Sequence, residues 1–257
     1  MIAVRDLEVS FGDRIVARVP QLDLPPGEVV GLAGESGSGK SMTALAITGL
    51  AEHVGARVSG SIRLGEQELV GLGERELRRI RGRRIAMIMQ SPRGALPPTQ
   101  RLGKLFDRTL RTHGVESADR RERILAAVRE VRLAEDLLER YPHQVSGGQA
   151  QRFAIALALA LRAEVLLADE PTSALDVTVQ AEVVALLRRV RDDHGAAILF
   201  ISHDLAVIGE LAERIVVMRA GEVVETGGAK QVLALPEHEY TRELVAAVPV
   251  IARSRAA

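Results

Sequence analysis

The stretch GESGSGKS, Gly34–Ser41, decides the fold of this chain. It fits the pattern Gly-x-x-x-x-Gly-Lys-Ser/Thr, and it lies between a predicted strand, Glu28–Ala33, and a helical pattern that runs from Lys40 to about Leu50. Glycines let backbone N–H groups turn inward around a phosphate, and the N-terminus of the following helix adds partial positive charge. The pattern therefore predicts a phosphate-binding loop, and the flanking elements disfavour the alternative of a glycine- and serine-rich surface turn.

Two side chains of this loop carry specific chemistry. Lys40 can reach the β- and γ-phosphates of a nucleoside triphosphate, and the Ser41 hydroxyl can bind Mg²⁺. We therefore expect ATP and Mg²⁺ as cofactors. The loop residues expected to bind the nucleotide are Gly34, Glu35, Ser36, Gly37, Ser38, Gly39, Lys40 and Ser41.

A second feature is VLLADEP, Val165–Pro171, an apolar strand that ends in two carboxylates. Ligands of parallel sheets bind at the carboxyl ends of the strands. Asp169 is predicted to hold Mg²⁺ directly or through water, whereas Glu170 points elsewhere and could polarise the attacking water. A solvated strand end followed by a proline turn is the alternative, and it would be a serious competitor if the phosphate loop were not present as well.

The elements around these motifs predict an α/β fold. The first part of the chain shows short strands, Ile2–Ser10 and Ile15–Val19 among them, which indicate an N-terminal antiparallel β subdomain. From Gly103 to Leu161 only helical periodicity is present, and strands then alternate with helices, as in a largely parallel sheet covered by helices. We expect an ATP-binding α/β core with its β subdomain over residues 1–92 and 163–257, and an inserted helical subdomain over residues 93–162.

Composition excludes several classes of function. The 257 residues carry 34 Lys and Arg against 34 Asp and Glu, so no basic footprint for nucleic acid is present. The absence of Cys excludes disulfides, cysteine-ligated zinc and iron–sulfur clusters. The apolar run FAIALALAL, Phe153–Leu161, is far shorter than the roughly 20 residues of a membrane helix and predicts a buried helix, so contact with a membrane has to come through a partner.

Four further motifs resemble those of the ABC ATPase family. VSGGQ, Val145–Gln149, looks like its signature motif and lies upstream of the Asp169–Glu170 strand, in the order that this family requires. SALD, Ser173–Asp176, resembles the D-loop, Gln90 in IMQSP resembles the Q-loop glutamine, and His203 in ISHD resembles the switch histidine. Because several motifs recur in one order over essentially the whole chain, the sequence is identified as a member of the ABC ATPase group of P-loop NTPases.

The resemblance implies that a second subunit takes part in nucleotide binding. Ser146, Gly147 and Gly148 precede or begin a helix, so their backbone donors form an anion site. In the ABC family this site faces the ATP of the other subunit, and two such chains enclose two nucleotides. Gln149 and Asp176 are assigned to the nucleotide-binding residues on the same basis.

The resemblance also implies roles for three single residues. His203 could hydrogen-bond the γ-phosphate and hold Glu170 and the water in position. Gln90 could bind Mg²⁺ through its amide oxygen, and its movement would couple the nucleotide state to a partner. Phe11 lies about where this family places an adenine-stacking aromatic. The alternatives are an ordinary loop residue for His203, a polar strand end for Gln90 and a core residue for Phe11.

Three stretches resemble the peptide and nickel importers of the family. They are Asp176–Gln180, His203–Gly227 and Leu235–Pro249, the last with the pattern Pro-x-His-x-Tyr-Thr-x-x-Leu. The chain lacks the cysteine-bearing C-terminal segment of many peptide-importer subunits, and Pro97 stands where the group commonly has Asn. The short length and the sequence IMQSPR look most like the nickel-importer type. The cargo stays open among nickel, a metal chelate, a dipeptide and an oligopeptide, because ATPase subunits do not touch it.

The resemblance implies several partners and a location. The partners are a second ABC ATPase subunit, which we expect to be a paralogue, two integral membrane permeases and, indirectly, an extracytoplasmic solute-binding protein, with no nucleic acid among them. The chain would then lie at the cytoplasmic face of the cell membrane, where the Gln90–Arg111 surface receives a permease helix. The alternatives are an ABC ATPase of DNA repair or translation, disfavoured by the single cassette and the balanced charge, and an exporter ATPase, disfavoured by the importer-like stretches.

Overall fold

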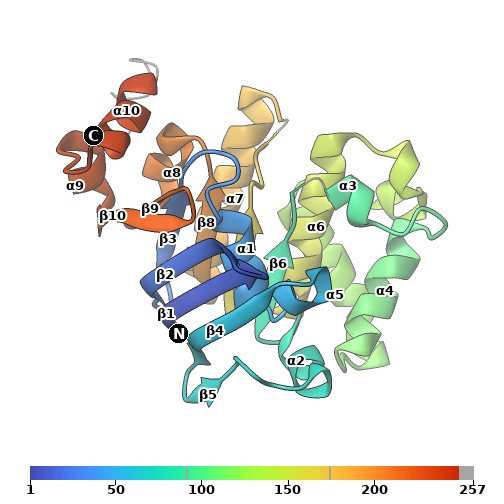
Figure 1. Cartoon of the computed structure of the whole chain (residues 1–257). Coiled ribbons are helices and arrows are strands. Elements are labelled where there is room, and N and C mark those ends of the chain that lie inside the picture. Colours follow the sequence, from blue (N-terminus) through green and yellow to red (C-terminus); the bar gives the residue numbers. More distant parts are fainter. Residues whose placement is uncertain (91, 174, 249–257) are drawn as a thin grey trace.

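The computed structural model describes residues 1–90, 92–173 and 175–248, so Ser91 of IMQSP, Ala174 of SALD and Pro249 of the last importer-like stretch lie outside the described residues. The described residues form a ten-stranded sheet in the order β5-β4-β1-β2-β10-β9-β3-β8-β7-β6 (Figure 1). The strands are β1 (Ile2–Phe11), β2 (Arg14–Leu24), β3 (Val29–Ala33), β4 (Arg57–Leu64), β5 (Gln67–Glu68), β6 (Ile85–Ile88), β7 (Val165–Asp169), β8 (Ala197–Ser202), β9 (Arg214–Arg219) and β10 (Glu222–Gly228).

The half of the sheet from β9 to β6 is parallel. β3 lies between β9 and β8, and β7 lies between β8 and β6, all in parallel register. Every residue of β3, β7 and β8 is buried, which explains their continuous apolar sequences, since a parallel sheet is covered on both faces. The carboxyl ends of these strands therefore lie side by side along one edge of the sheet.

The other half is mostly antiparallel, as predicted for the N-terminal strands, and its two parts meet through one parallel pair, Glu222 of β10 with Arg18 of β2. β1 pairs with both β2 and β4, and β10 pairs with β9. The predicted strand Ile15–Val19 is too short, because Leu22 and Leu24 continue the buried row of β2 beyond Pro20. The expectation of a largely parallel sheet therefore holds only from β9 to β6.

The helices cover both faces of the sheet, and α3 to α6 gather at one side of it (Figure 1). In β8, Ile198 and Phe200 belong to one buried apolar cluster and Leu199 and Ile201 to another, because successive strand residues point to opposite faces. The helices are α1 (Lys40–Ile47), α2 (Glu74–Ile80), α3 (Pro92–Ala95), α4 (Leu102–Thr112), α5 (Ser117–Glu130), α6 (Gly147–Leu161), α7 (Val177–His194), α8 (Leu205–Leu211), α9 (Ala229–Ala234) and α10 (Glu239–Ala247), with 3₁₀ turns at Ala51–Val54, Glu135–Glu139 and Pro142–Gln144.

Helix α6 contains the apolar run Phe153–Leu161, and it is a largely buried helix, as predicted. Within the described ranges, the structure contains no helix with the length and apolar character that crossing a membrane requires. Helix α7 ends at His194, and Gly195 after it has the left-handed conformation (φ 62°) that commonly ends a helix.

Candidate active site

The phosphate loop lies between β3 and α1, and its shape depends on glycine at two positions. Gly34 and Gly39 have φ angles of 147° and 101°, a range that other residues rarely adopt. A Cβ at Gly34 would collide with the Met218 carbonyl oxygen, and a Cβ at Gly39 would lie 2.6 Å from the Val16 carbonyl oxygen. Residues 35–37 between them are exposed. Both ends of the loop are therefore packed against the sheet while its tip is open to a ligand.

Lys40 is buried beneath this loop. Its Nζ donates to the carbonyl oxygens of Gly34 and Glu35 at 2.7 Å and to Ser38 Oγ at 3.3 Å. Burial lowers the pKa of Lys40, and the nearby carboxylates at the end of β7 oppose that change. A buried ammonium group that is held mainly by neutral carbonyl groups gains from an added anion, so Lys40 favours a phosphate at the loop.

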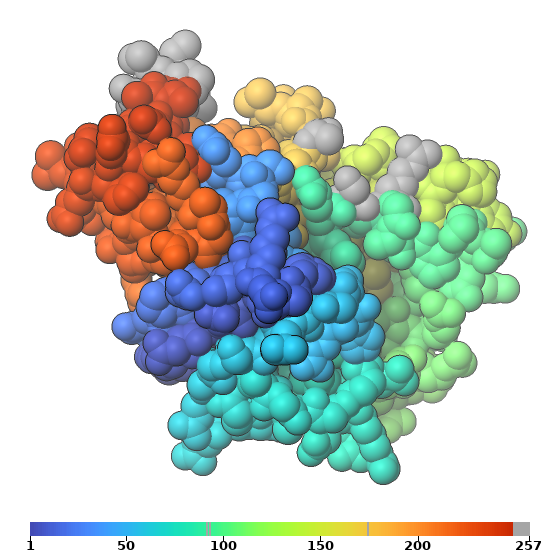
Figure 2. Space-filling model, viewed as in Figure 1, coloured from blue at the N-terminus to red at the C-terminus, as the bar shows by residue number. Residues whose placement is uncertain are grey.

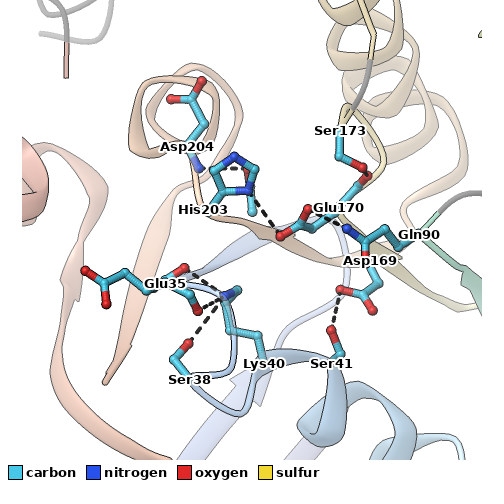
Figure 3. A network of polar contacts seen from close by, with 12 residues as sticks. Glu35, Ser38, Lys40, Ser41, Gln90, Asp169, Glu170, Ser173, His203 and Asp204 are labelled. Atoms are coloured by element: carbon cyan, nitrogen blue, oxygen red, sulfur yellow. Dashed lines mark hydrogen bonds and ion pairs between the residues drawn. The ribbon is translucent and has the colours of Figure 1, made fainter. Parts of the chain in front are cut away.

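Asp169 ends β7 and faces the phosphate loop. The Ser41 hydroxyl donates to Asp169 Oδ1 at 3.1 Å (Figure 3). Burial raises the pKa of Asp169 and the Glu170 carboxylate adds to the rise, whereas the Ser41 hydrogen bond and the Lys40 charge oppose it. A desolvated carboxylate beside a second carboxylate is stabilised by a cation, so this position favours a divalent metal.

Glu170 is held by side chains from the two strands that flank its own. Gln90 Nε2 donates to Glu170 Oε2 at 2.9 Å, and His203 Nδ1 lies 3.1 Å from Glu170 Oε1 (Figure 3). Gln90 follows β6, Glu170 follows β7 and His203 follows β8, so the parallel register brings the three together. Glu170 has a φ of 45°, in the left-handed region, and Ser173 Oγ donates to its carbonyl oxygen at 2.9 Å. Both carboxylate oxygens therefore have a fixed partner.

The signature residues lie on a different element, at the start of α6. Ser146 Oγ accepts a hydrogen bond from the Gln149 N–H at 3.2 Å, while Gln149 Oε1 accepts one from the Ser146 N–H at 2.9 Å. Gly147 and Gly148 form the first turn, and Ser146 and Gly147 are exposed. This reciprocal capping fixes the start of the helix and leaves an exposed helix N-terminus that can bind an anion.

Two predicted nucleotide contacts lie at the ends of other elements. Asp176 caps α7, where its Oδ1 accepts a hydrogen bond from the Val179 N–H at 3.0 Å. Phe11 ends β1 and is 39% exposed, so the alternative of a core residue is wrong. An exposed ring at this place is open to stacking.

One contact of the phosphate loop was not predicted. The Glu35 N–H donates to Tyr240 Oη at 3.0 Å, and Tyr240 lies on α10 near the end of the described chain. The pattern Pro-x-His-x-Tyr-Thr contains this tyrosine, but a linear pattern does not say which segments meet in space. The loop therefore has a neighbour that the motif analysis missed.

The oxygen atoms near the end of β7 fit Mg²⁺ in kind. Mg²⁺ takes carboxylate, hydroxyl and amide oxygens and usually completes its shell with substrate phosphates and water. Ser41 and Asp169 are already within hydrogen-bond distance of each other, and the Gln90 amide lies beside Glu170. These residues could hold the ion next to a bound triphosphate.

Comparison with known proteins decides the family. Residues 18–173 match the ABC transporter family. The chain belongs to this family. The match includes the phosphate loop, Gln90, the signature residues and the carboxylates at the end of β7, so this ABC cassette is an ATP-binding ATPase of a transporter.

Several curated relatives align with nearly the whole cassette. It is 43% identical, over 99% of its length, to a probable peptide ABC transporter ATP-binding protein of Sinorhizobium fredii, of which it covers 78%. It is 40% identical, over 99% of its length, to a dipeptide transport ATP-binding protein of Escherichia coli K12, of which it covers 80%. A peptidoglycan transport ATP-binding protein of Agrobacterium fabrum is 44% identical over 97% of this chain, which spans only 47% of that relative.

Solved structures agree with the fold of the ABC cassette. A dimeric structure of MJ0796, a bacterial ABC transporter cassette, has a TM-score of 0.79 and 29% identity, covering 89% of this chain and 99% of that chain. A dimer of the same protein in a post-hydrolysis state, bound to ADP and Pi, has a TM-score of 0.79, 28% identity and the same coverage. The ABC ATPase fold that the motifs predicted is therefore confirmed.

Proposed function

We propose that this cassette energises a membrane importer for peptides or a related small solute, with hydrolysis of Mg-ATP to ADP and phosphate as its energy source. The observation that supports the proposed site is the arrangement along one edge of the sheet. The phosphate loop follows β3, Asp169 and Glu170 lie at the end of β7, and Gln90 and His203 follow the strands on either side of β7. One site therefore contains residues for phosphate binding, for metal binding and for the activation of water.

Binding of the triphosphate begins at the loop. Lys40 exchanges its contacts with the loop carbonyls for phosphate oxygens, and the backbone N–H groups of the loop face the same phosphates. Mg²⁺, held by Ser41, Asp169 and the Gln90 amide, would supply positive charge that neutralises the phosphate oxygens. These contacts stabilise the reacting group by position and charge, which is the main source of catalysis in phosphoryl transfer.

Glu170 acts on the attacking water. Its carboxylate orients the water and accepts a proton from it while the water oxygen bonds to the γ-phosphorus and the bond to the β–γ bridging oxygen breaks. In its imidazolium form His203 would donate from Nδ1 to this carboxylate and from Nε2 to a γ-phosphate oxygen. Gln90 donates to Glu170 in the present structure, so binding the metal would require it to turn its amide, and this change reaches the helical segment that follows it.

A second ATPase subunit completes the proposed site. Helix α6, which begins with the signature residues, lies among the helices at one side of the sheet (Figure 1), whereas the phosphate loop follows β3. The MJ0796 structures are dimers, which supports the same arrangement here. Ser146, Gly147, Gly148, Gln149 and Asp176 then contact the nucleotide of the partner, which we expect to be a paralogue, and Phe11 stacks on the adenine within the chain.

The proposed cargo rests on the names of the relatives. They are called peptide, dipeptide and peptidoglycan transport proteins, which favours a peptide-like cargo over nickel. Nickel transport stays a prediction from the IMQSPR stretch. Two integral membrane permeases and an extracytoplasmic solute-binding protein would supply the path and the capture of the cargo, with the cassette at the cytoplasmic face of the membrane.

A groove beside α4 supports the docking of a permease helix within the Gln90–Arg111 surface. Its two acidic residues are already paired, Asp107 with Arg120 and Glu139 with Arg101. The groove therefore favours an acidic segment of the permease, since complementary charges steer association. The basic residues that line it are Arg101, Lys104, Arg108 and Arg111.

Reconstitution with the permeases encoded beside this chain tests the proposal. In vesicles that contain the permeases and the solute-binding protein, we expect peptide uptake that requires ATP and that stops with Glu170→Gln, while this variant still binds ATP. Uptake of nickel but not of peptide would show that the proposed peptide cargo is wrong. ATPase activity that depends on DNA or ribosomes, without a permease that co-purifies, would refute the transport function.

A further inference from the structure

The segment Pro236–Thr241, which carries the pattern Pro-x-His-x-Tyr-Thr, has no part in the proposed chemistry, yet it reaches the phosphate loop. Tyr240 is 2% exposed, and its Oη accepts a hydrogen bond from the Glu35 N–H at 3.0 Å. Figure 2 shows the red C-terminal segment packed on the orange β9–β10 pair at one end of the molecule. A residue more than 200 positions away in the sequence thus contacts the loop.

The tyrosine is held in place by the strands that it packs on. Glu225 of β10 accepts hydrogen bonds from the N–H groups of Glu237 and His238, both at 3.0 Å. His238 Nδ1 accepts one from the Tyr240 N–H at 3.1 Å and so caps α10. The Arg219 guanidinium lies over the Tyr240 ring, 4.7 Å from its centroid. The spacing of the pattern within this segment therefore places these groups so that they fix the position of the tyrosine hydroxyl.

The tyrosine and Lys40 share one residue of the loop. The Glu35 N–H is bonded to Tyr240, and the Glu35 carbonyl oxygen accepts from Lys40 Nζ at 2.7 Å. When Lys40 turns to a phosphate, Tyr240 remains as the side chain that holds Glu35. The adjacent Gly34 packs against Met218, which precedes Arg219 in β9, so the same strand supports both the loop and the tyrosine.

We propose that Tyr240 is a positioning residue for the nucleotide, whose hydroxyl keeps the phosphate loop in the conformation that binds ATP and ADP. The inference rests on the proposed nucleotide site at Gly34–Ser41. When only a fraction of the molecules holds the binding conformation, the apparent affinity falls by that fraction. Loss of one neutral hydrogen bond at the loop therefore predicts a roughly threefold to tenfold weaker affinity.

Tyr240→Phe tests this inference, because it removes the hydroxyl and keeps the ring that Arg219 covers. We expect the Kd for Mg-ADP, measured by isothermal titration on the full chain well below its Tm, to rise about threefold to tenfold. Hydrogen exchange at residues 34–38 should become faster in the nucleotide-free chain. Tyr141→Phe is the matched control, since Tyr141 is the other of the two tyrosines, and it should leave the Kd unchanged.

The outcomes separate this inference from the proposed site. A lower Tm with a native Kd for Mg-ADP would mean that Tyr240 only packs, and the inference would be wrong. Lys40→Ala is the test of the site itself: a native Kd in that variant would refute the nucleotide site. If Lys40→Ala raises the Kd for Mg-ADP and Tyr240→Phe leaves it unchanged, the role of Tyr240 is refuted and the nucleotide site stands.

Discussion

The contact between His203 and Glu170 predicts a specific pattern of rates in a double-mutant cycle. Removal of a general base lowers a rate by about 10²–10⁴, so Glu170→Gln should lose that much ATPase activity. His203→Ala removes one hydrogen bond to a charged group, worth about 1.5–3 kcal/mol, or roughly tenfold to 150-fold in rate. The His203 side chain is 60% exposed and that of Glu170 is 14% exposed, so solvent weakens the contact and the expected loss is about tenfold.

The double variant distinguishes a positioning role from an independent one. If His203 acts through the Glu170 carboxylate, then adding His203→Ala to Glu170→Gln should lower the rate by less than about twofold, because residues that act as a unit are not additive. The assay is phosphate release at saturating Mg-ATP, on the assembled pair of cassettes. Nδ1 of His203 is 3.1 Å from the carboxylate, whereas His194 Nε2 lies 3.7 Å from Glu130 on another part of the surface. His194→Ala is therefore a matched control and should leave the rate unchanged.

Two results would refute this reasoning. If the separate losses multiply in the double variant, His203 acts on the substrate without Glu170. If Glu170→Gln alone hydrolyses ATP at the native rate, the general base lies elsewhere.

Three further predictions follow from the same site and its surroundings. Asp169→Asn should abolish Mg²⁺-dependent hydrolysis and raise the Tm of the nucleotide-free chain. Because burial raises the pKa of Asp169, the stability that its protonated carboxyl contributes is present below the unfolded pKa of about 4 and is lost as pH rises through the folded pKa. The gain in Tm of the variant, measured by calorimetry, should therefore grow with pH, and a variant with the native Tm at all pH values would contradict this. Ser146→Ala removes a helix N-cap and should cost about 1 kcal/mol in denaturant unfolding, together with weaker ATP-dependent pairing by light scattering; unchanged values of both would contradict the capping role. Lys104→Glu with Arg108→Glu should leave the ATPase rate of the isolated cassette unchanged and reduce peptide uptake in vesicles at least tenfold by charge repulsion, and native uptake would exclude this docking surface.

The parts of this fold that depend on local patterns could be predicted from the sequence. The phosphate loop and β7 were recognised because each has a short pattern with a direct physical meaning: glycines before a helix, and an apolar run before carboxylates. The meeting of Gln90, Glu170 and His203 also follows, because all three come after strands and parallel strands place such residues at one edge.

The parts of the fold that depend on contacts between distant segments could not be predicted from the sequence. Strand β10, Glu222–Gly228, mixes charged residues and glycines, and its pairing with β9 rather than its own sequence makes it a strand. The bond between Glu35 and Tyr240 depends in turn on how β10 carries the C-terminal segment back to the loop. The left-handed backbone at Glu170 was missed for a similar reason, since nothing in ADEP marks it.

The left-handed backbone at Glu170 means that stability and catalysis favour different residues at this position. With a φ of 45°, Glu170 occupies a region where glycine is the residue with the least steric cost. A library of variants that is screened only for survival after heating should therefore accept glycine here and return inactive proteins. Engineering of a more heat-resistant cassette has to select for hydrolysis in the same round.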